Sequence, residues 1–166
     1  LETASRESLV RAIREYGEEK RWNRVVNAII EARGSGVLLR TTTAAELVSE
    51  AVGGRRFRQK MHPATKTFQG IRIAINGEME ALAVTLPKAF RALKPNGVLA
   101  VISFHSLEDR MVKRFMRKIA GRPEHKWDRS VLQDRKSFAE LLSTKIISPS
   151  NYEVSNNPRS RSARLR

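Results

Sequence analysis

The chain has 166 residues, 40% of them hydrophobic, which is enough to build a folded core. It contains no cysteine, which excludes disulfides and thiolate chemistry, and no apolar run approaches the ~20 residues of a membrane span. Its 32 lysines and arginines against 17 acidic residues give a net charge of +15, which indicates a polyanionic partner, nucleic acid rather than a membrane surface. We expect a soluble intracellular protein.

Residues 1–61 are predicted to form a small module of three helices. Ser5 stands where it can cap the first helix. The second helix carries an apolar stripe with helical spacing over residues 22–30, which we interpret as a core face. Thr43, with Glu46 three residues later, fits a capping box for the third helix.

Residues 51–77 contain no acidic residue, and aromatic and amide side chains are interleaved with the basic ones. A run of charge is usually only a solvated face, but cations beside stacking groups also suit unpaired RNA bases. We therefore predict contact with nucleic acid in this stretch. The residues expected to hold phosphates are Arg55, Arg56, Arg58 and Lys60.

A fourth helix is predicted to begin at Pro63 and to continue its apolar stripe as far as Leu82. Pro87 is expected to interrupt it, with Thr85 as the cap of a following helix. The tripeptide Pro95–Asn96–Gly97 then predicts a turn that leads into a strand.

The strand over residues 98–102 is apolar and β-branched, which is typical of a buried strand in a parallel sheet. A helix follows, with Ser106 as its expected cap and Asp109 as the capping-box partner. Ligands of open α/β sheets bind at the carboxyl ends of the strands, which is where His105 and Glu108 also fall. A plain connection with a cap and solvated charge explains the same residues, and both interpretations stay open.

Beyond residue 120 the pattern weakens. Residues 121–136 are predicted to form an exposed excursion, 138–142 a short helix and 145–147 a brief strand. The acid-free tail over 156–166 is rich in arginine, which is often a sign of disorder, but it also alternates in a way that fits an edge strand.

The order helix, strand, helix is that of a doubly wound α/β sheet. Such folds open with a glycine-rich turn after their first strand, and this sequence has none. We therefore expect the second half of an α/β fold, with no cofactor-binding residue of its own. The histidines, His62, His105 and His125, lack metal-ligand spacing, so no metal site is expected.

Several stretches together resemble the small-subunit ribosomal RNA cytosine-N4 methyltransferases of bacteria and organelles. They are REYGEEKRWNRVVNAIIEAR (14–33), TTTAAEL (41–47), HPATKTFQGIRIAIN (62–76), LKPNGVLAVISFHSLEDRMVKRF (93–115) and ISPSNYEVSNNPRSRSARLR (147–166). The resemblance runs over nearly the whole chain in the family's order. HPATKTFQ and SFHSLEDR are its most specific motifs.

The resemblance implies a partial Rossmann-like methyltransferase fold of the α/β class with an all-helical insert domain. Residues 1–61 would be the insert, which recognises the substrate, and 62–166 the carboxyl-terminal half of the Rossmann-like domain. The methyl donor would be S-adenosylmethionine, bound mostly by an upstream half. The product would be N4-methylcytidine in the decoding region. The implied location is the bacterial cytoplasm, or a plastid or mitochondrion.

The implied partner is small-subunit ribosomal RNA or the assembled small subunit, with no membrane; a homodimer stays open. The residues expected to line the cytidine pocket or order its edge are His105, Ser106, Glu108 and Asp109. Those expected to face the RNA or support the pocket are His62, Thr65, Lys66, Thr67, Gln69, Arg159 and Arg161. The alternative function is a non-enzymatic ribosomal-RNA-binding or ribosome-assembly module, which the basic charge fits equally well.

The sequence departs from the family pattern in two small ways. Asn96 stands where the family's turn has a glycine, and Gly70 stands where its helix has an alanine. Both replacements are expected to be tolerated, although a glycine inside a helix costs up to ~1 kcal/mol relative to alanine.

Overall fold

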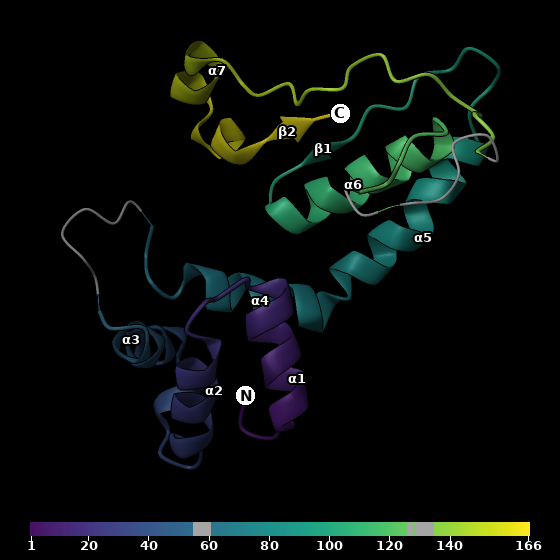
Figure 1. The fold of residues 1–166 in the computed structure, drawn as a ribbon. Coiled ribbons are helices and arrows are strands. Elements are labelled where there is room, and N and C mark those ends of the chain that lie inside the picture. Colours follow the sequence, from purple (N-terminus) through teal and green to yellow (C-terminus); the bar gives the residue numbers. More distant parts are fainter. Residues whose placement is uncertain (55–60, 126–127, 129–134) are drawn as a thin grey trace. The chain divides into compact units, whose positions relative to one another are not determined.

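The computed structural model describes residues 1–54, 61–125, 128 and 135–166. The chain forms two compact units, which we name the helical unit (Leu1–Glu78) and the carboxyl-terminal unit (Met79–Arg166) (Figure 1). Among the described residues, no helix has both the length and the apolar character needed to span a membrane.

The helical unit is built around a core that the amphipathic stripe of its second helix supplies. Its elements are α1 (Arg6–Val10), the π-helical turn η1 (Arg11–Tyr16), α2 (Trp22–Glu31), the 3-10 turn η2 (Val37–Leu39), α3 (Thr41–Ala51) and α4 (Thr65–Asn76). Ser5 caps α1 as predicted, since its hydroxyl oxygen accepts the N–H of Ser8 at 3.1 Å. The stripe of α2 is confirmed as a core face by the burial of Val25, Val26 and Ile29.

The predicted cap of the third helix is wrong. The helix α3 begins at Thr41, and its N-cap position is Arg40, which makes no side-chain cap bond. Thr43 lies inside the first turn, where its hydroxyl donates to the carbonyls of Val37 and Arg40. A threonine hydroxyl that finds an acceptor in the preceding turn can stay inside a helix, so the helix begins before it.

Two glycines allow α4 to pack closely against η1. A Cβ atom on Gly70 would lie 2.0 Å from the carbonyl oxygen of Ala12 and 2.6 Å from the amide nitrogen of Gly17. A Cβ atom on Gly17 would lie 2.6 Å from the carbonyl oxygen of Lys66. Neither glycine has a positive φ, so close approach of the two backbones is what requires them.

We predict that Gly70→Ala destabilises the helical unit, although alanine favours a helix by up to ~1 kcal/mol. The added methyl group has to displace backbone atoms rather than flexible side chains, and overpacking of this kind costs about 1–3 kcal/mol. The net loss is measurable by denaturant unfolding followed by circular dichroism. Ile75→Ala on the same helix is the control, because Ile75 is 78% exposed. Equal or greater stability of Gly70→Ala would contradict the close contact.

The break after α4 falls at Gly77 and not at the predicted position, Pro87. Gly77 adopts a left-handed conformation, with a φ of 59°, and ends α4. The next helix, α5 (Glu78–Arg91), runs through Pro87 without interruption. A left-handed glycine is a strong helix stop, whereas a proline near the end of a helix removes only one main-chain bond there.

The carboxyl-terminal unit packs helices against a minimal sheet. Its elements after α5 are β1 (Ile102–Ser103), α6 (Ser106–Ile119), α7 (Asn151–Asn156), the 3-10 turn η4 (Pro158–Ser162) and β2 (Arg164–Leu165). Its core joins Leu86 of α5 to Val112 and Met116 of α6. The helix predicted over 138–142 is wrong, since those residues form neither helix nor strand. In the predicted strand 145–147, Ile147 forms a bridge with Leu165.

The predicted buried parallel strand is wrong in direction and in environment. The strands β1 and β2 pair antiparallel, with Ile102 opposite Leu165, and main-chain bonds between Val101 and Arg166 extend the ladder. Val101 packs against the core of α6, whereas Ile102 is 59% exposed. Only one face of this short sheet is covered by the described residues, so burial alternates along it. This helix-dominated fold with a two-stranded sheet is compatible with a partial methyltransferase fold.

The turn before β1 is confirmed at residues 95–97, and it explains one departure from the family pattern. Asn96 has a φ of 65°, in the left-handed region that favours glycine. Asparagine is among the residues that tolerate this conformation best. Asparagine is therefore suited to this position.

Candidate functional site

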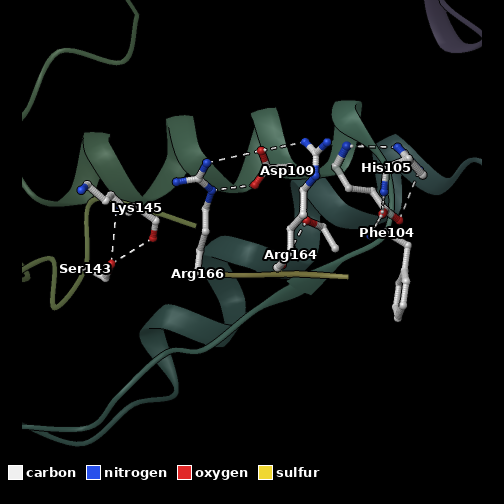
Figure 2. A network of polar contacts seen from close by, with 9 residues as sticks. Phe104, His105, Asp109, Ser143, Lys145, Arg164 and Arg166 are labelled. Carbon is white, nitrogen blue, oxygen red and sulfur yellow. Dashed lines mark hydrogen bonds and ion pairs between the residues drawn. The ribbon is translucent and has the colours of Figure 1, made fainter. Parts of the chain in front are cut away.

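A reciprocal capping box holds the turn between β1 and α6 (Figure 2). His105 is the N-cap residue, and its Nδ1 accepts the N–H of Glu108 at 3.3 Å. The Oε2 atom of Glu108 in turn accepts the N–H of Phe104 at 2.8 Å and that of His105 at 3.3 Å. The other carboxylate oxygen, Oε1, lies 3.3 Å from Nε2 of His105. The His105 side chain is only 8% exposed.

The predicted cap, Ser106 with Asp109 as its partner, is wrong by one residue. The pairs Ser106/Asp109 and His105/Glu108 overlap in the sequence, and both have the three-residue spacing of a capping box. The longer side chain of Glu108 reaches the amides that precede the helix, whereas Ser106 is the first residue of α6. Asp109 is left to make a different contact.

Asp109 forms ion pairs with Arg164 of β2 and with Arg166, which follows that strand (Figure 2). Arg166 binds it with both donors of its guanidinium edge, Nε to Oδ1 at 2.6 Å and Nη2 to Oδ2 at 3.3 Å. Arg164 adds a longer bond, Nη1 to Oδ2 at 3.4 Å. The side chains of Asp109 and Arg166 are 9% and 10% exposed, while that of Arg164 is 41% exposed.

Burial alone raises the pKa of the Asp109 carboxyl, because it penalises the charged form. The hydrogen bonds and positive charge of Arg166, with the charge of Arg164, outweigh burial and hold the pKa of that carboxyl below its usual value. The ionised form is therefore the one that the folded unit stabilises. The buried, bidentate pair of Asp109 and Arg166 therefore joins α6 to the residue that follows β2.

We predict that Asp109→Asn destabilises the carboxyl-terminal unit by about 3 kcal/mol, because it leaves the buried guanidinium of Arg166 without its charge partner. Arg164→Gln is the matched control and should cost less than ~1 kcal/mol, since Arg164 is partly exposed. The local measurement is hydrogen exchange of the Val101 amide, which donates to the carbonyl of Arg166. Unchanged protection of that amide in Asp109→Asn would contradict the role of this ion pair.

The same ion pair predicts loss of stability in acid. A carboxyl with a lowered folded-state pKa stabilises the fold above its unfolded-state pKa, about 3.9 for aspartate. The contribution is lost as the pH falls from that value through the lower folded-state pKa. Protection of the Val101 amide should therefore fall as the pH drops below about 4 in the unaltered chain. Asp109→Asn should lack this part of the acid dependence.

The predicted RNA-facing residues of the helical unit differ in their exposure. His62 is exposed, and its Nδ1 accepts the N–H of Ala64 at 3.2 Å. Lys66 is half-buried and donates to the carbonyl of Glu18 at 3.3 Å. Thr65 and Gln69 are also half-buried. The four predicted phosphate-binding residues, Arg55, Arg56, Arg58 and Lys60, lie outside the described residues.

Thr67 is fully buried in the helical unit. Its hydroxyl oxygen has no hydrogen-bond partner among the residues that the structure describes. A side chain with no exposed surface supports its neighbours rather than touching a ligand. Of the two roles expected for this residue, its position favours the supporting one.

The carboxyl-terminal arginines divide into an exposed pair and a structural pair. Arg159 and Arg161 are exposed on the 3-10 turn η4, which Asn157 caps by accepting the N–H of Arg159 at 3.3 Å. Arg164 and Arg166 are the partners of Asp109, a role that sequence analysis missed. A signal existed, because residues two apart on a strand share a face, and an aspartate inside a buried helical stripe needs a cation.

The glycines of the described residues do not form the turn that approaches a nucleotide or adenosyl cofactor in α/β folds. In this class of fold a glycine-rich turn between a strand and a helix approaches the cofactor closely. The glycines at 53 and 54 follow helix α3, and Gly97 precedes β1 rather than following it. Among the described residues, no strand leads into a glycine-rich turn.

Comparison with known proteins gives a consistent result. A model of the MraW methylase family matches residues 1–166. The chain is 47% identical, over its whole length and 52% of the relative's length, to "Ribosomal RNA small subunit methyltransferase H" of Nitrosococcus oceani. Proteins of the same name from Cereibacter sphaeroides and Coprothermobacter proteolyticus are 46% and 42% identical, over 98% and 100% of this chain and 49% and 50% of their own lengths. The resemblance predicted from the sequence is confirmed, and the chain spans about half the length of these relatives.

Proposed function

Because the chain belongs to the MraW methylase family, we propose that it is the carboxyl-terminal part of a ribosomal RNA methyltransferase. The family match over every residue of the chain is the observation that carries this proposal. The proposed reaction is methylation of the N4 amine of a cytidine in the decoding region of small-subunit ribosomal RNA. S-adenosylmethionine is the proposed donor, and the bacterial relatives support the bacterial cytoplasm as the compartment.

We propose that residues 1–61 form the substrate-recognition domain and that 62–166 complete a Rossmann-like domain together with an upstream half. The exposure of the outer face of the sheet supports the upstream half in this proposal. Val98, Ile102 and Phe104 are 65%, 59% and 55% exposed, which is unusual for alternate apolar residues beside a strand. A larger sheet with helices on both faces would bury them.

The proposed reaction requires no covalent bond between the protein and its substrates. An amine attacks a methyl group on a sulfonium, so the protein has to position the cytosine and let the amine lose a proton. S-adenosylmethionine supplies the electrophilic methyl group when it is bound. The part proposed for this chain is to bind the RNA, to hold the splayed base in a pocket and to exclude water from it.

We propose that the turn after β1 borders the cytidine pocket, with His105, Ser106 and Glu108 at its edge. Asp109 orders that edge through its ion pair with Arg166. The position of the turn at the carboxyl end of a strand supports this assignment, since ligands of α/β folds bind there. The capping box supplies the rigidity that a base-positioning turn needs.

We propose that the RNA contacts come from exposed polar and basic side chains on both units. The exposure of Arg159 and Arg161 supports their assignment to phosphates, as does that of His62 to the RNA surface. Thr65, Lys66 and Gln69 are proposed to flank this surface, with Thr67 as their buried support. Arg55, Arg56, Arg58 and Lys60 are kept as proposed phosphate contacts on the basis of the sequence alone.

The proposal is tested with the complete protein, that is, this chain with the proposed upstream half. We predict that it converts cytidine to N4-methylcytidine in unmethylated small subunits, detected by mass spectrometry of digested RNA. The chain alone should bind S-adenosylmethionine weakly or not at all by calorimetry, because no glycine-rich turn follows a strand in its sequence. RNA binding without methyl transfer by the complete protein would favour the non-enzymatic assembly module.

The role of the turn is tested by Glu108→Gln in the complete enzyme. The amide keeps an oxygen that can accept the N–H groups of the capping box, so stability should fall by less than ~1 kcal/mol. If the carboxylate borders the pocket, turnover should fall at least about tenfold, a loss of ~1.4 kcal/mol in transition-state stabilisation. His105→Ala should lose both stability and turnover, since it removes the cap itself.

The control for the turn is Ser150→Ala. Ser150 caps α7 by accepting the N–H of Glu153 at 3.1 Å, and it lies outside the proposed pocket. Its loss should cost about 1 kcal/mol of stability and leave turnover per folded molecule unchanged. Unaltered turnover in Glu108→Gln and His105→Ala would mean that the turn serves only to cap α6.

A further inference from the structure

A groove of about 430 Å³ lies between α5 and α6 in the carboxyl-terminal unit. Its apolar lining comes from Met79 and Leu86 of α5 and from Met111 and Phe115 of α6. The ring of Phe115 is half-buried and is held edge-on by Phe90, with centroids 6.3 Å apart and an angle of 76° between the planes. The volume falls within the range of about 300–1,000 Å³ that is typical of small-molecule pockets.

A row of cations borders this groove on its α6 side. Arg110, Arg114 and Lys118 all line it, all are exposed, and each follows the last by four residues. Such spacing places one cation per helical turn, at intervals of about 6 Å along the axis. The one acidic residue of the lining is Glu124, whose Oε1 lies 3.8 Å from Nζ of Lys118. The groove is therefore apolar inside and positive along one border.

We propose that the groove between α5 and α6 binds single-stranded RNA. Phosphates lie along Arg110, Arg114 and Lys118, and a base lies in the apolar interior against Phe115. A positive track beside an aromatic surface is the arrangement with which proteins hold single strands without reading their sequence. The net charge of +15 favours a polyanion over an apolar peptide.

The inference rests on the proposed function only in that ribosomal RNA is the expected source of the strand. The groove uses none of the residues assigned to the turn after β1. It also differs from the basic stretch before α4, which belongs to the helical unit. It would give the carboxyl-terminal unit an RNA contact of its own, beside the arginines of η4.

The test measures binding of the 166-residue chain to a fluorescein-labelled oligouridylate of about 12 nucleotides, within the usual site size of such proteins. The test pair is Arg114→Gln with Lys118→Gln. The control pair is Lys113→Gln with Lys88→Gln, which removes the same charge from the same kinds of position, mid-helix and last turn. Lys113 and Lys88 are exposed residues of α6 and α5 that do not line the groove. Thermal melting is used to check that the chain with each pair of substitutions folds.

We expect the test pair to lower the slope of log affinity against log salt by about 1.4, since each phosphate contact on a single strand contributes about 0.7. The control pair should leave the slope unchanged. Phe115→Leu should weaken binding at least about fivefold with no change of slope, because a stacked base contributes affinity without charge. Equal losses in the test and control pairs would overturn the proposal.

An acidic protein segment is the competing occupant. An oligoglutamate peptide of the same length should not displace the RNA at equal concentration; if it does, the groove is a site for acidic chains and the proposal is wrong. The measurement needs neither methyl donor nor turnover. If the test pair lowers RNA binding but the complete protein transfers no methyl group, the groove is upheld and the proposed reaction is wrong. If the complete protein transfers a methyl group but the test pair leaves the salt slope unaltered, the reaction is upheld and the groove is wrong.

Discussion

The ion pair between Asp109 and Arg166 determines how the carboxyl-terminal unit closes. Arg166 bonds through its main chain to Val101 beside β1 and through its side chain to α6, so one residue joins sheet and helix. The strands β1 and β2 have two residues each, too few for a stable two-stranded sheet without further support. The buried pair supplies that support, and β2 comes directly after the 3-10 turn that carries Arg159 and Arg161.

Much of the fold could be predicted wherever one short stretch of sequence determines the structure. The apolar stripe of α2, the Ser5 cap and the turn at residues 95–97 each depend on neighbours within a few positions. The errors arise where two local signals compete. Gly77 ends a helix that Pro87 was expected to end, and His105 with Glu108 forms the capping box that Ser106 with Asp109 also fits. Side-chain length and backbone freedom decide such cases, and the spacing of residue types alone does not say which signal prevails.

The position of the candidate site in the chain could be predicted from the sequence, but its side-chain contacts could not. The sequence indicates that His105, Glu108 and Asp109 cluster at one turn, and the structure puts the first two in direct contact. It could not reveal that Asp109 pairs with Arg166, because the two are 57 positions apart and their pairing depends on the register of β2. The same limit applies to Gly70. A glycine inside a helix appears locally as a modest cost, and only the approach of η1 gives it a reason.

The helix α6 brings these roles together because its faces serve different purposes. Asp109, Val112 and Met116 follow one another at helical spacing and form its buried face. A carboxylate at the end of an apolar stripe needs a cation, which explains why β2 carries arginine there. The adjoining face presents Arg110, Arg114 and Lys118 beside the groove, and the helix begins at the capping box. Because these faces share few residues, substitutions on one face can alter stability, the proposed RNA affinity or the turn after β1 while the other two stay as they are.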